Sequence, residues 1–118
     1  MVDPDPPELS IAGEVLDVAY ERIEEALRPL LQRLFPAPAR LRFAYKDEWD
    51  ELRIEAPGFD MCFTGHLFAS SYRLGSLDEA VAFYREISAA LTRHGISNHI
   101  EIMHKEPDGS WSDSIVLP

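Results

Sequence analysis

The chain has 118 residues, which is the length of a single domain. Hydrophobic residues make up 46% of it, enough to bury a core, so intrinsic disorder is excluded as its general state. The 21 acidic residues outnumber the 11 basic ones, and the resulting net charge of −10 repels both nucleic-acid phosphates and anionic membranes. The single cysteine excludes an internal disulfide and a zinc site built from several cysteines.

The first eight residues, MVDPDPPE, are rich in proline and acid and show no apolar periodicity. They predict a flexible acidic N-terminal arm over residues 1–8, followed by a single domain over residues 9–118. The arm lacks the basic and apolar regions of a secretory signal, and no apolar run reaches the ~20 residues that span a bilayer. Together with one unpaired thiol, these features predict a cytoplasmic protein with no membrane partner.

Residues 9–35 show the periodicity of a helix. Apolar side chains recur at steps of three and four residues, as one buried stripe requires: Leu16, Tyr20, Ile23, Leu27, Leu30 and Leu34. Pro29 removes a backbone donor inside this run and predicts a kink or a break. Pro36 and Pro38 end the helical region.

Three strands are expected next. Residues 41–46 and 51–55 alternate between apolar and polar side chains, which is the period of a half-buried strand. Residues 47–50 form the polar tip between them, and Pro57-Gly58 suits a type II turn. A third strand follows over residues 59–67, with Gly65 as a candidate bulge.

The second helix has clear signals at both ends. Ser76 and Glu79 form a capping box, and Gly95 is placed to end the helix in the left-handed conformation. Strands over residues 98–105 and 111–117 complete the chain. The sequence therefore predicts an α+β fold of order α-β-β-β-α-β-β: a two-layer sandwich with two helices on one face of a mostly antiparallel, five-stranded sheet.

Residues with catalytic potential are few. Cys62 and His66 lie ~13 Å apart on one extended strand, too far for a thiol–imidazole pair. His99 and Glu101 share a strand face and supply two metal ligands without a third. No nucleophile elbow and no phosphate-binding glycine loop occurs in the sequence. We therefore expect no catalytic site, metal or cofactor. A small enzyme or a metal- or ligand-binding domain that uses His66, His99 and Glu101 is an alternative.

Two concentrations of acid are candidates for partner binding. Glu14, Asp17 and Glu21 fall on one face of the first predicted helix, where a merely solvated face is the alternative. The second concentration is the predicted hairpin tip Asp47, Glu48, Trp49, Asp50 and Glu51, in which carboxylates flank a large indole. An aromatic anchor inside a charged rim is typical of interfaces, and folding of Trp49 back over the sheet edge is the alternative.

The sheet face opposite the helices is expected to have a mixed character, as either a partner or self-association surface or a solvated face. The residues predicted to lie on it are Arg42, Ala44, Lys46, Arg53, Cys62, Thr64, His66, Phe68, His99, Glu101 and Met103.

Size, acidity, predicted compartment and the lack of active-site motifs resemble the immunity proteins that bacteria make against their own toxins. That resemblance implies a non-catalytic protein that binds a basic toxin and blocks its active site or substrate groove. The element order also resembles class I type III secretion chaperones, which implies a homodimer that holds an extended effector segment. We expect an acidic inhibitor of a cognate basic toxin, with the chaperone dimer as the alternative.

Overall fold

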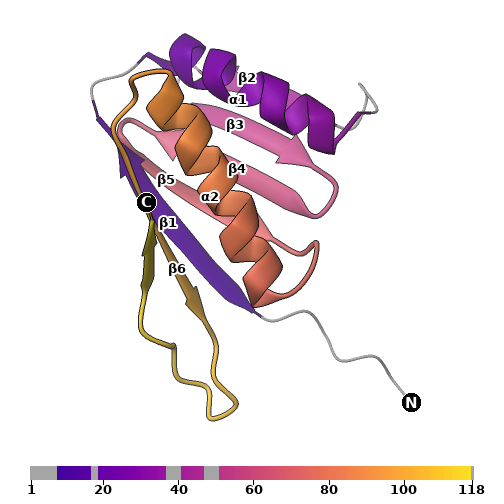
Figure 1. The fold of residues 1–118 in the computed structure, drawn as a ribbon, viewed down its shortest axis with the longest axis vertical. Helices are drawn as coiled ribbons and strands as arrows, with labels where there is room; N and C mark the ends of the chain where they lie inside the picture. The colour runs from indigo at the N-terminus through magenta and orange to yellow at the C-terminus, as the bar shows by residue number, and fades with distance from the viewer. Residues whose placement is uncertain (1–7, 17–18, 37–40, 47–50, 118) are drawn as a thin grey trace.

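The computed structural model describes residues 8–16, 19–36, 41–46 and 51–117. Within these ranges the chain forms two helices and a seven-stranded antiparallel sheet of order β2-β3-β4-β5-β1-β6-β7 (Figure 1). The predicted α+β class is confirmed, whereas five strands were too few. The elements in chain order are β1 (Leu9–Val15), α1 (Tyr20–Leu34), β2 (Arg42–Lys46), β3 (Glu51–Ala56), β4 (Phe59–Thr64), β5 (Leu67–Tyr72), α2 (Leu77–Arg93), β6 (Asn98–His104) and β7 (Ile115–Leu117).

The start of the predicted first helix is wrong, because Leu9–Val15 forms strand β1 in the interior of the sheet, between β5 and β6. Ile11 and Val15 are the buried residues of this strand. Their spacing of four residues puts them on one face of a helix and equally on one face of a strand, so it does not distinguish the two. The helical stripe that the sequence predicts holds only from Tyr20 onward.

The predicted third strand is also wrong, because residues 59–67 belong to two strands. β4 ends at Thr64, and a tight turn with Gly65 at φ 63° leads into β5 at Leu67. Gly65 is therefore a turn residue and not a bulge. The turn reverses the chain, so that Phe68 pairs with the buried Phe63 and is itself only 4% exposed.

The helix ends follow local sequence signals. α1 continues through Pro29, so the predicted break is wrong. At the start of α2, the Ser76 side chain accepts a hydrogen bond from the Glu79 N–H at 3.2 Å, as the capping signal predicts. At its end, Gly95 has a positive φ of 73° and the Ile96 N–H donates to the Leu91 carbonyl.

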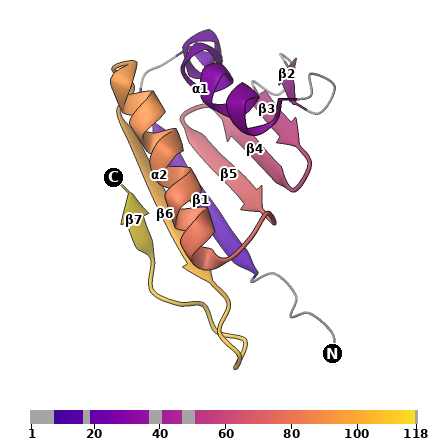
Figure 2. The same ribbon diagram turned by 45° about the vertical axis from the view of Figure 1, so that its right-hand side comes forward.

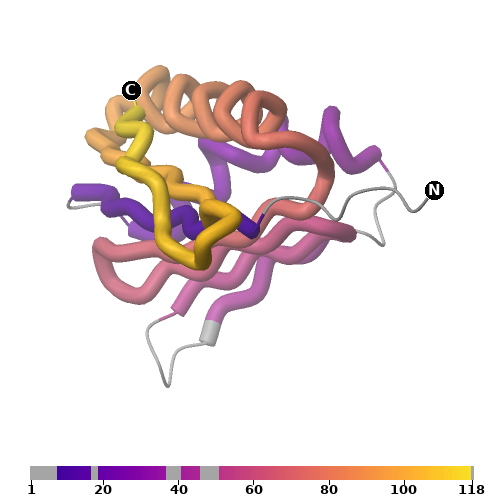
Figure 3. The backbone as a smooth tube through the Cα atoms, turned by 90° about the horizontal axis from the view of Figure 1, so that it is seen from below, coloured from indigo at the N-terminus to yellow at the C-terminus, as the bar shows by residue number. Residues whose placement is uncertain are grey.

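Both helices contact the same face of the sheet, which we call the inner face (Figures 2 and 3). α1 lies over the β2–β4 half, where the Arg28 guanidinium stacks 4.4 Å from the Phe43 ring centroid. α2 lies over β5, β1 and β6, and its Tyr84 hydroxyl is 2.6 Å from Ser70 Oγ on β5. The core between them is apolar and includes Leu27, Leu52, Met61, Ile87 and Ile100, none of which is exposed to solvent.

The predicted last strand is shorter than expected. Only Ile115–Leu117 forms β7, which pairs with β6, while Trp111 makes an isolated bridge to Lys105. The indole of Trp111 is 44% exposed. Before β1, the Glu8 carbonyl accepts a hydrogen bond from the Lys105 N–H, and residues 1–7 of the predicted arm lie outside the described ranges. Neither helix is long and apolar enough to cross a membrane.

Candidate functional site

The predicted partner-binding acids occupy different elements. Residues 47–50 and Asp17 lie outside the described ranges. Glu51 begins β3 and Glu21 is exposed in the first turn of α1. Glu14 is part of β1, so the predicted helix face that joins Glu14 to Glu21 is wrong. This error and the misplaced helix start have the same cause, because the spacing of three and four residues continues from α1 back through the residues of β1.

The sheet face opposite the helices, which we call the outer face, has small side chains along its middle row. Directly paired residues of antiparallel strands point to the same face, so Ala12, Ala69, Cys62, Arg53 and Ala44 form one continuous row across five strands. Glu14 and Glu51 lie on one side of this row, Glu55 and Asp60 lie on the other, and Glu101 continues the row onto β6 opposite Ala12. The basic residues at outer-face positions of β2 and β3 are Arg42, Lys46 and Arg53.

Most of the predicted outer-face residues lie where the alternation puts them, because the pairing register places the positions on β2, β3, β4 and β6 on this side. Two residues differ. Phe68 points to the inner face, because the turn at Gly65 resets the alternation. His66 lies in that turn, where its carbonyl accepts a hydrogen bond from the Val15 N–H at 2.8 Å.

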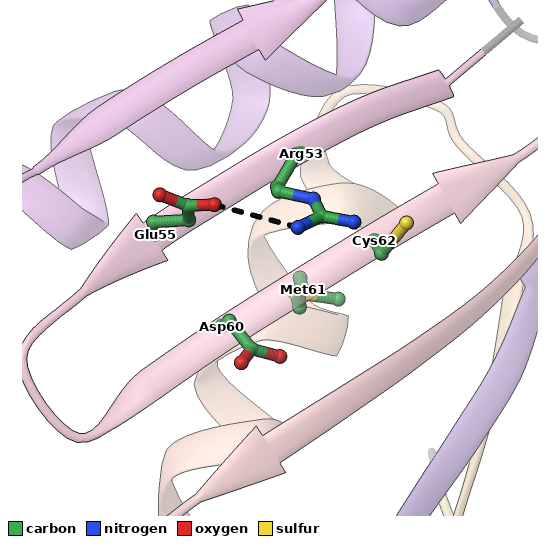
Figure 4. A pocket seen from close by; sticks show the side chains of 5 residues that line it. All are labelled: Arg53, Glu55, Asp60, Met61 and Cys62. Carbon is green, nitrogen blue, oxygen red and sulfur yellow. Dashed lines mark ion pairs between the residues drawn. The ribbon is translucent and has the colours of Figure 1, made fainter. Parts of the chain in front are cut away.

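The most closely packed polar group on the outer face is centred on Glu51, Arg53 and Cys62. The Cys62 thiol donates to Glu51 Oε1 at 2.9 Å, and Arg53 Nη2 lies 3.5 Å from the same carboxylate oxygen. Arg53 Nη1 is 3.7 Å from Glu55 Oε1, and its Nε atom is buried without a hydrogen-bond partner. Arg53, Glu55 and Cys62, together with Asp60 and Met61, line a cavity of about 150 Å³ (Figure 4).

The electrostatics of this group favour a neutral thiol. Burial, followed by the hydrogen bond to Glu51 and its negative charge, raises the pKa of the Cys62 thiol above its ordinary value. The Glu51 charge in turn raises the pKa of Arg53, which keeps the guanidinium charged. A thiol in this state is a poor nucleophile, because the reactive species is the thiolate.

His99 and His104 each form a pair with a neighbouring carboxylate. His99 Nε2 is 3.4 Å from Glu101 Oε1 on the outer face, so the structure does bring together the two predicted ligands. His104 Nε2 is 3.2 Å from Glu106 Oε1. Over the described part of the chain, which includes His66, His99 and Glu101, no three histidine, cysteine, aspartate or glutamate residues are placed to hold a metal ion.

A second cavity, of about 500 Å³, lies between α2 and β7 and was missed at the level of sequence. Its helix wall contains Arg85 and Arg93, and its strand wall contains Val116. The spacing of the lining residues on α2 indicates that they share one helix face. That this face lies next to a strand more than twenty residues further along the chain depends on the tertiary fold and could not be predicted.

Comparison with protein-family models, with curated proteins and with solved structures finds no match for this chain.

Proposed function

We propose that this chain is a non-catalytic, acidic binding protein that inhibits a basic protein partner, and that the partner is a cognate bacterial toxin. The observation that carries the proposal is the outer face of the sheet. Both helices contact the inner face, and among the described residues the outer-face positions hold five acidic residues against three basic ones, Arg42, Lys46 and Arg53, of which Arg53 already pairs with Glu51 and Glu55. The surplus negative charge is therefore available to a cationic partner.

The shape of the outer face supports a protein partner. We take the fold to be a two-layer sandwich, which leaves this face broad and free of helices over the residues described. The small side chains of Ala12 and Ala69 allow close approach along its middle. Leu67 and Val116 are 55% and 51% exposed and supply apolar area near the carboxylates. Apolar groups within a charged rim are the usual composition of an interface.

Charge complementarity gives such a surface its function. A partner rich in lysine and arginine is attracted over a Debye length, ~10 Å at moderate salt, and its encounter with the acidic face is accelerated. The predicted tip, residues 47–50, directly precedes Glu51 in the sequence and contains three further acidic residues, Asp47, Glu48 and Asp50. Bound there, the chain would exclude the toxin's own substrate. A cytoplasmic location, where a toxin made in the same cell must be neutralised, belongs to this proposal.

The state of Cys62 supports a binding role over catalysis. Its thiol is held neutral beside a carboxylate, and no histidine side chain accepts its proton among the described hydrogen bonds. A chaperone dimer is a different proposal, and light scattering separates the two. A monomer that forms a one-to-one complex with a toxin agrees with inhibition, whereas a stable dimer in the free protein argues for the chaperone.

The direct test uses the protein encoded by the gene next to this one. Its C-terminal domain is expressed in a bacterial host alone and together with this chain, and growth is measured. The proposal predicts arrest by the domain alone, rescue on co-expression, and a complex that elutes as one species. A neighbouring domain that is harmless, or toxicity that persists although this chain is present and folded, would contradict the proposal.

A further inference from the structure

The groove between α2 and β7 has walls of opposite character. Its floor and strand wall are lined by Ala89, Leu117 and Val116, of which Val116 has its side chain on the outer face opposite Glu101, whereas arginines lie on the helix side. The full set of lining residues is Arg85, Ser88, Ala89, Thr92, Arg93, Val116 and Leu117. The helix positions follow steps of three and four residues, so they form one face of α2, and α2 runs alongside the β6–β7 edge of the sheet (Figure 2).

Four basic residues of the described ranges pair with a carboxylate, Arg28, Arg33, Arg53 and Lys105, and the two arginines of the groove do not. Arg28 pairs with Glu24 at 2.6 Å and Arg33 lies 4.0 Å from Glu86. Arg85 and Arg93 are exposed and have no carboxylate partner in the part of the chain that the structure describes. In a chain with 21 acidic and 11 basic residues, two uncompensated guanidinium groups on one apolar groove form a local positive site. Such a site complements carboxylates.

The strand wall offers a second kind of recognition. β7 is the last strand in the sheet order and pairs only with β6 among the described strands. The backbone N–H and C=O groups on its other side are therefore available to a further strand. Glu101, which lies directly across from Val116, is paired with His99 on the outer face, so its charge is directed away from the groove.

We infer that this groove binds an extended, acidic segment of a partner protein, which adds to the sheet beside β7. Backbone hydrogen bonds to the strand edge supply affinity, and alternate side chains of the segment have different neighbours. Side chains of an added strand alternate between the two faces of the sheet, so carboxylates at every second position reach Arg85 and Arg93 on the helix side. The apolar side chains between them lie on the outer face beside Val116. The inference is independent of the proposed function, which concerns a cationic partner on the outer face.

The experiment uses the full chain and a fluorescein-labelled synthetic peptide of alternating glutamate and valine, with lysine–valine and glutamate–proline peptides as controls. Binding is followed by fluorescence anisotropy and located by amide chemical shifts. We expect saturable binding of the glutamate–valine peptide, with shifts confined to α2 and β7. The lysine–valine peptide should cause no shifts in α2 and β7, because Arg85 and Arg93 repel it, and any binding to the acidic outer face belongs to the proposed function. The proline peptide should bind more weakly, because every second residue has no N–H to donate.

Variants test the role of the arginines. The double substitution Arg85→Glu and Arg93→Glu changes exposed side chains and should weaken peptide binding at least about tenfold. Arg73→Glu, also exposed but outside the groove, is the matched control and should bind like the parent chain. Each variant is checked for the parent's circular dichroism. Groove shifts of equal size with the two charged peptides, outer-face shifts with the glutamate–valine peptide, or an equal loss in Arg73→Glu would overturn the inference. So would light scattering that shows a dimer closing this edge to the peptide.

Discussion

The sulfur atom of Cys62 lies 2.9 Å from Oε1 of Glu51, across the β3–β4 pair of the sheet. This contact joins the only thiol of the chain to an acid of the candidate binding face. It also explains why the thiol favours its protonated form, because a thiolate at this distance would face the Glu51 carboxylate.

Substitution Glu51→Gln should therefore make Cys62 more reactive. Glutamine retains an acceptor for the thiol but removes the negative charge, so the thiol pKa falls and the thiolate fraction near pH 8 rises. The rate of alkylation by iodoacetamide, measured as a function of pH, checks this. The matched control Glu101→Gln removes an outer-face carboxylate that does not contact Cys62, and it should leave the pH profile unchanged. A Glu51→Gln profile identical to that of the parent would show that the carboxylate does not influence the thiol.

Gly13 should be intolerant of even a methyl group. It faces Phe68 across the β1–β5 pair, and an added Cβ would lie 2.5 Å from Phe68 Cζ and would also overlap the His99 carbonyl oxygen. We expect Gly13→Ala to lower the free energy of unfolding by about 1–3 kcal/mol, as measured by urea denaturation. Ala12→Ser, at the adjacent exposed position, should change it by less than ~0.5 kcal/mol. Equal stability of the two variants would mean that β1 does not approach β5 as described.

Tyr84 should make stability fall at alkaline pH. Burial, the largest cause, together with the Asp60 charge raises its pKa above the ordinary value of 10, although the hydrogen bond with Ser70 partly opposes this. Because the folded-state pKa is the higher one, the neutral hydroxyl contributes stability that is complete below pH 10 and is lost as pH rises above it.

The substitution Tyr84→Phe tests this dependence. At pH 8 it should cost about 1 kcal/mol for the lost hydrogen bond. Above pH 10 its stability should fall less steeply than that of the parent, by up to ~1.4 kcal/mol per pH unit. The pKa of Tyr45 is raised to about 12, mainly by burial and by Glu24, and this tyrosine contributes equally to the pH dependence of stability in the parent and in the variant. Urea denaturation at several pH values measures the difference, and parallel curves would contradict the burial of Tyr84.

The elements that were predicted correctly from the sequence carry local signals that are compatible with only one secondary structure. The cap at Ser76, the left-handed Gly95 and the Pro57-Gly58 turn fix α2 and the β3–β4 hairpin. β1 was missed because Ile11 and Val15 fit both periods, and its identity as a strand depends on pairing with β5 and β6, far along the chain. The β4–β5 turn was missed because Gly65 was interpreted as a bulge within a single strand.

In the candidate site, too, local features could be predicted from the sequence and long-range contacts could not. Strand alternation correctly placed Arg53, Cys62 and His99 on one face, since parity along a strand is a local property. It could not show that Cys62 meets Glu51, because that contact depends on the β3–β4 register. The groove beside β7 could not be predicted for a related reason: its walls are separated in the sequence by the whole of β6 and the loops on both sides of it.

The central claim, that surplus carboxylates bind a cationic partner, is tested most directly by association kinetics. The chain is mixed with the C-terminal domain of the neighbouring gene's product, and the association rate is measured from low to high salt. The tip variant carries Asp47→Lys, Glu48→Lys and Asp50→Lys. The control variant has the same net charge but carries its three reversals at exposed positions elsewhere: Glu25→Lys, Asp78→Lys and Asp113→Lys.

The account predicts that the tip variant associates at least about tenfold more slowly at low salt, that the difference shrinks as salt rises, and that the control variant stays close to the parent. Equal rates for the tip variant and the parent at every ionic strength, or an equal loss in both variants, would contradict it.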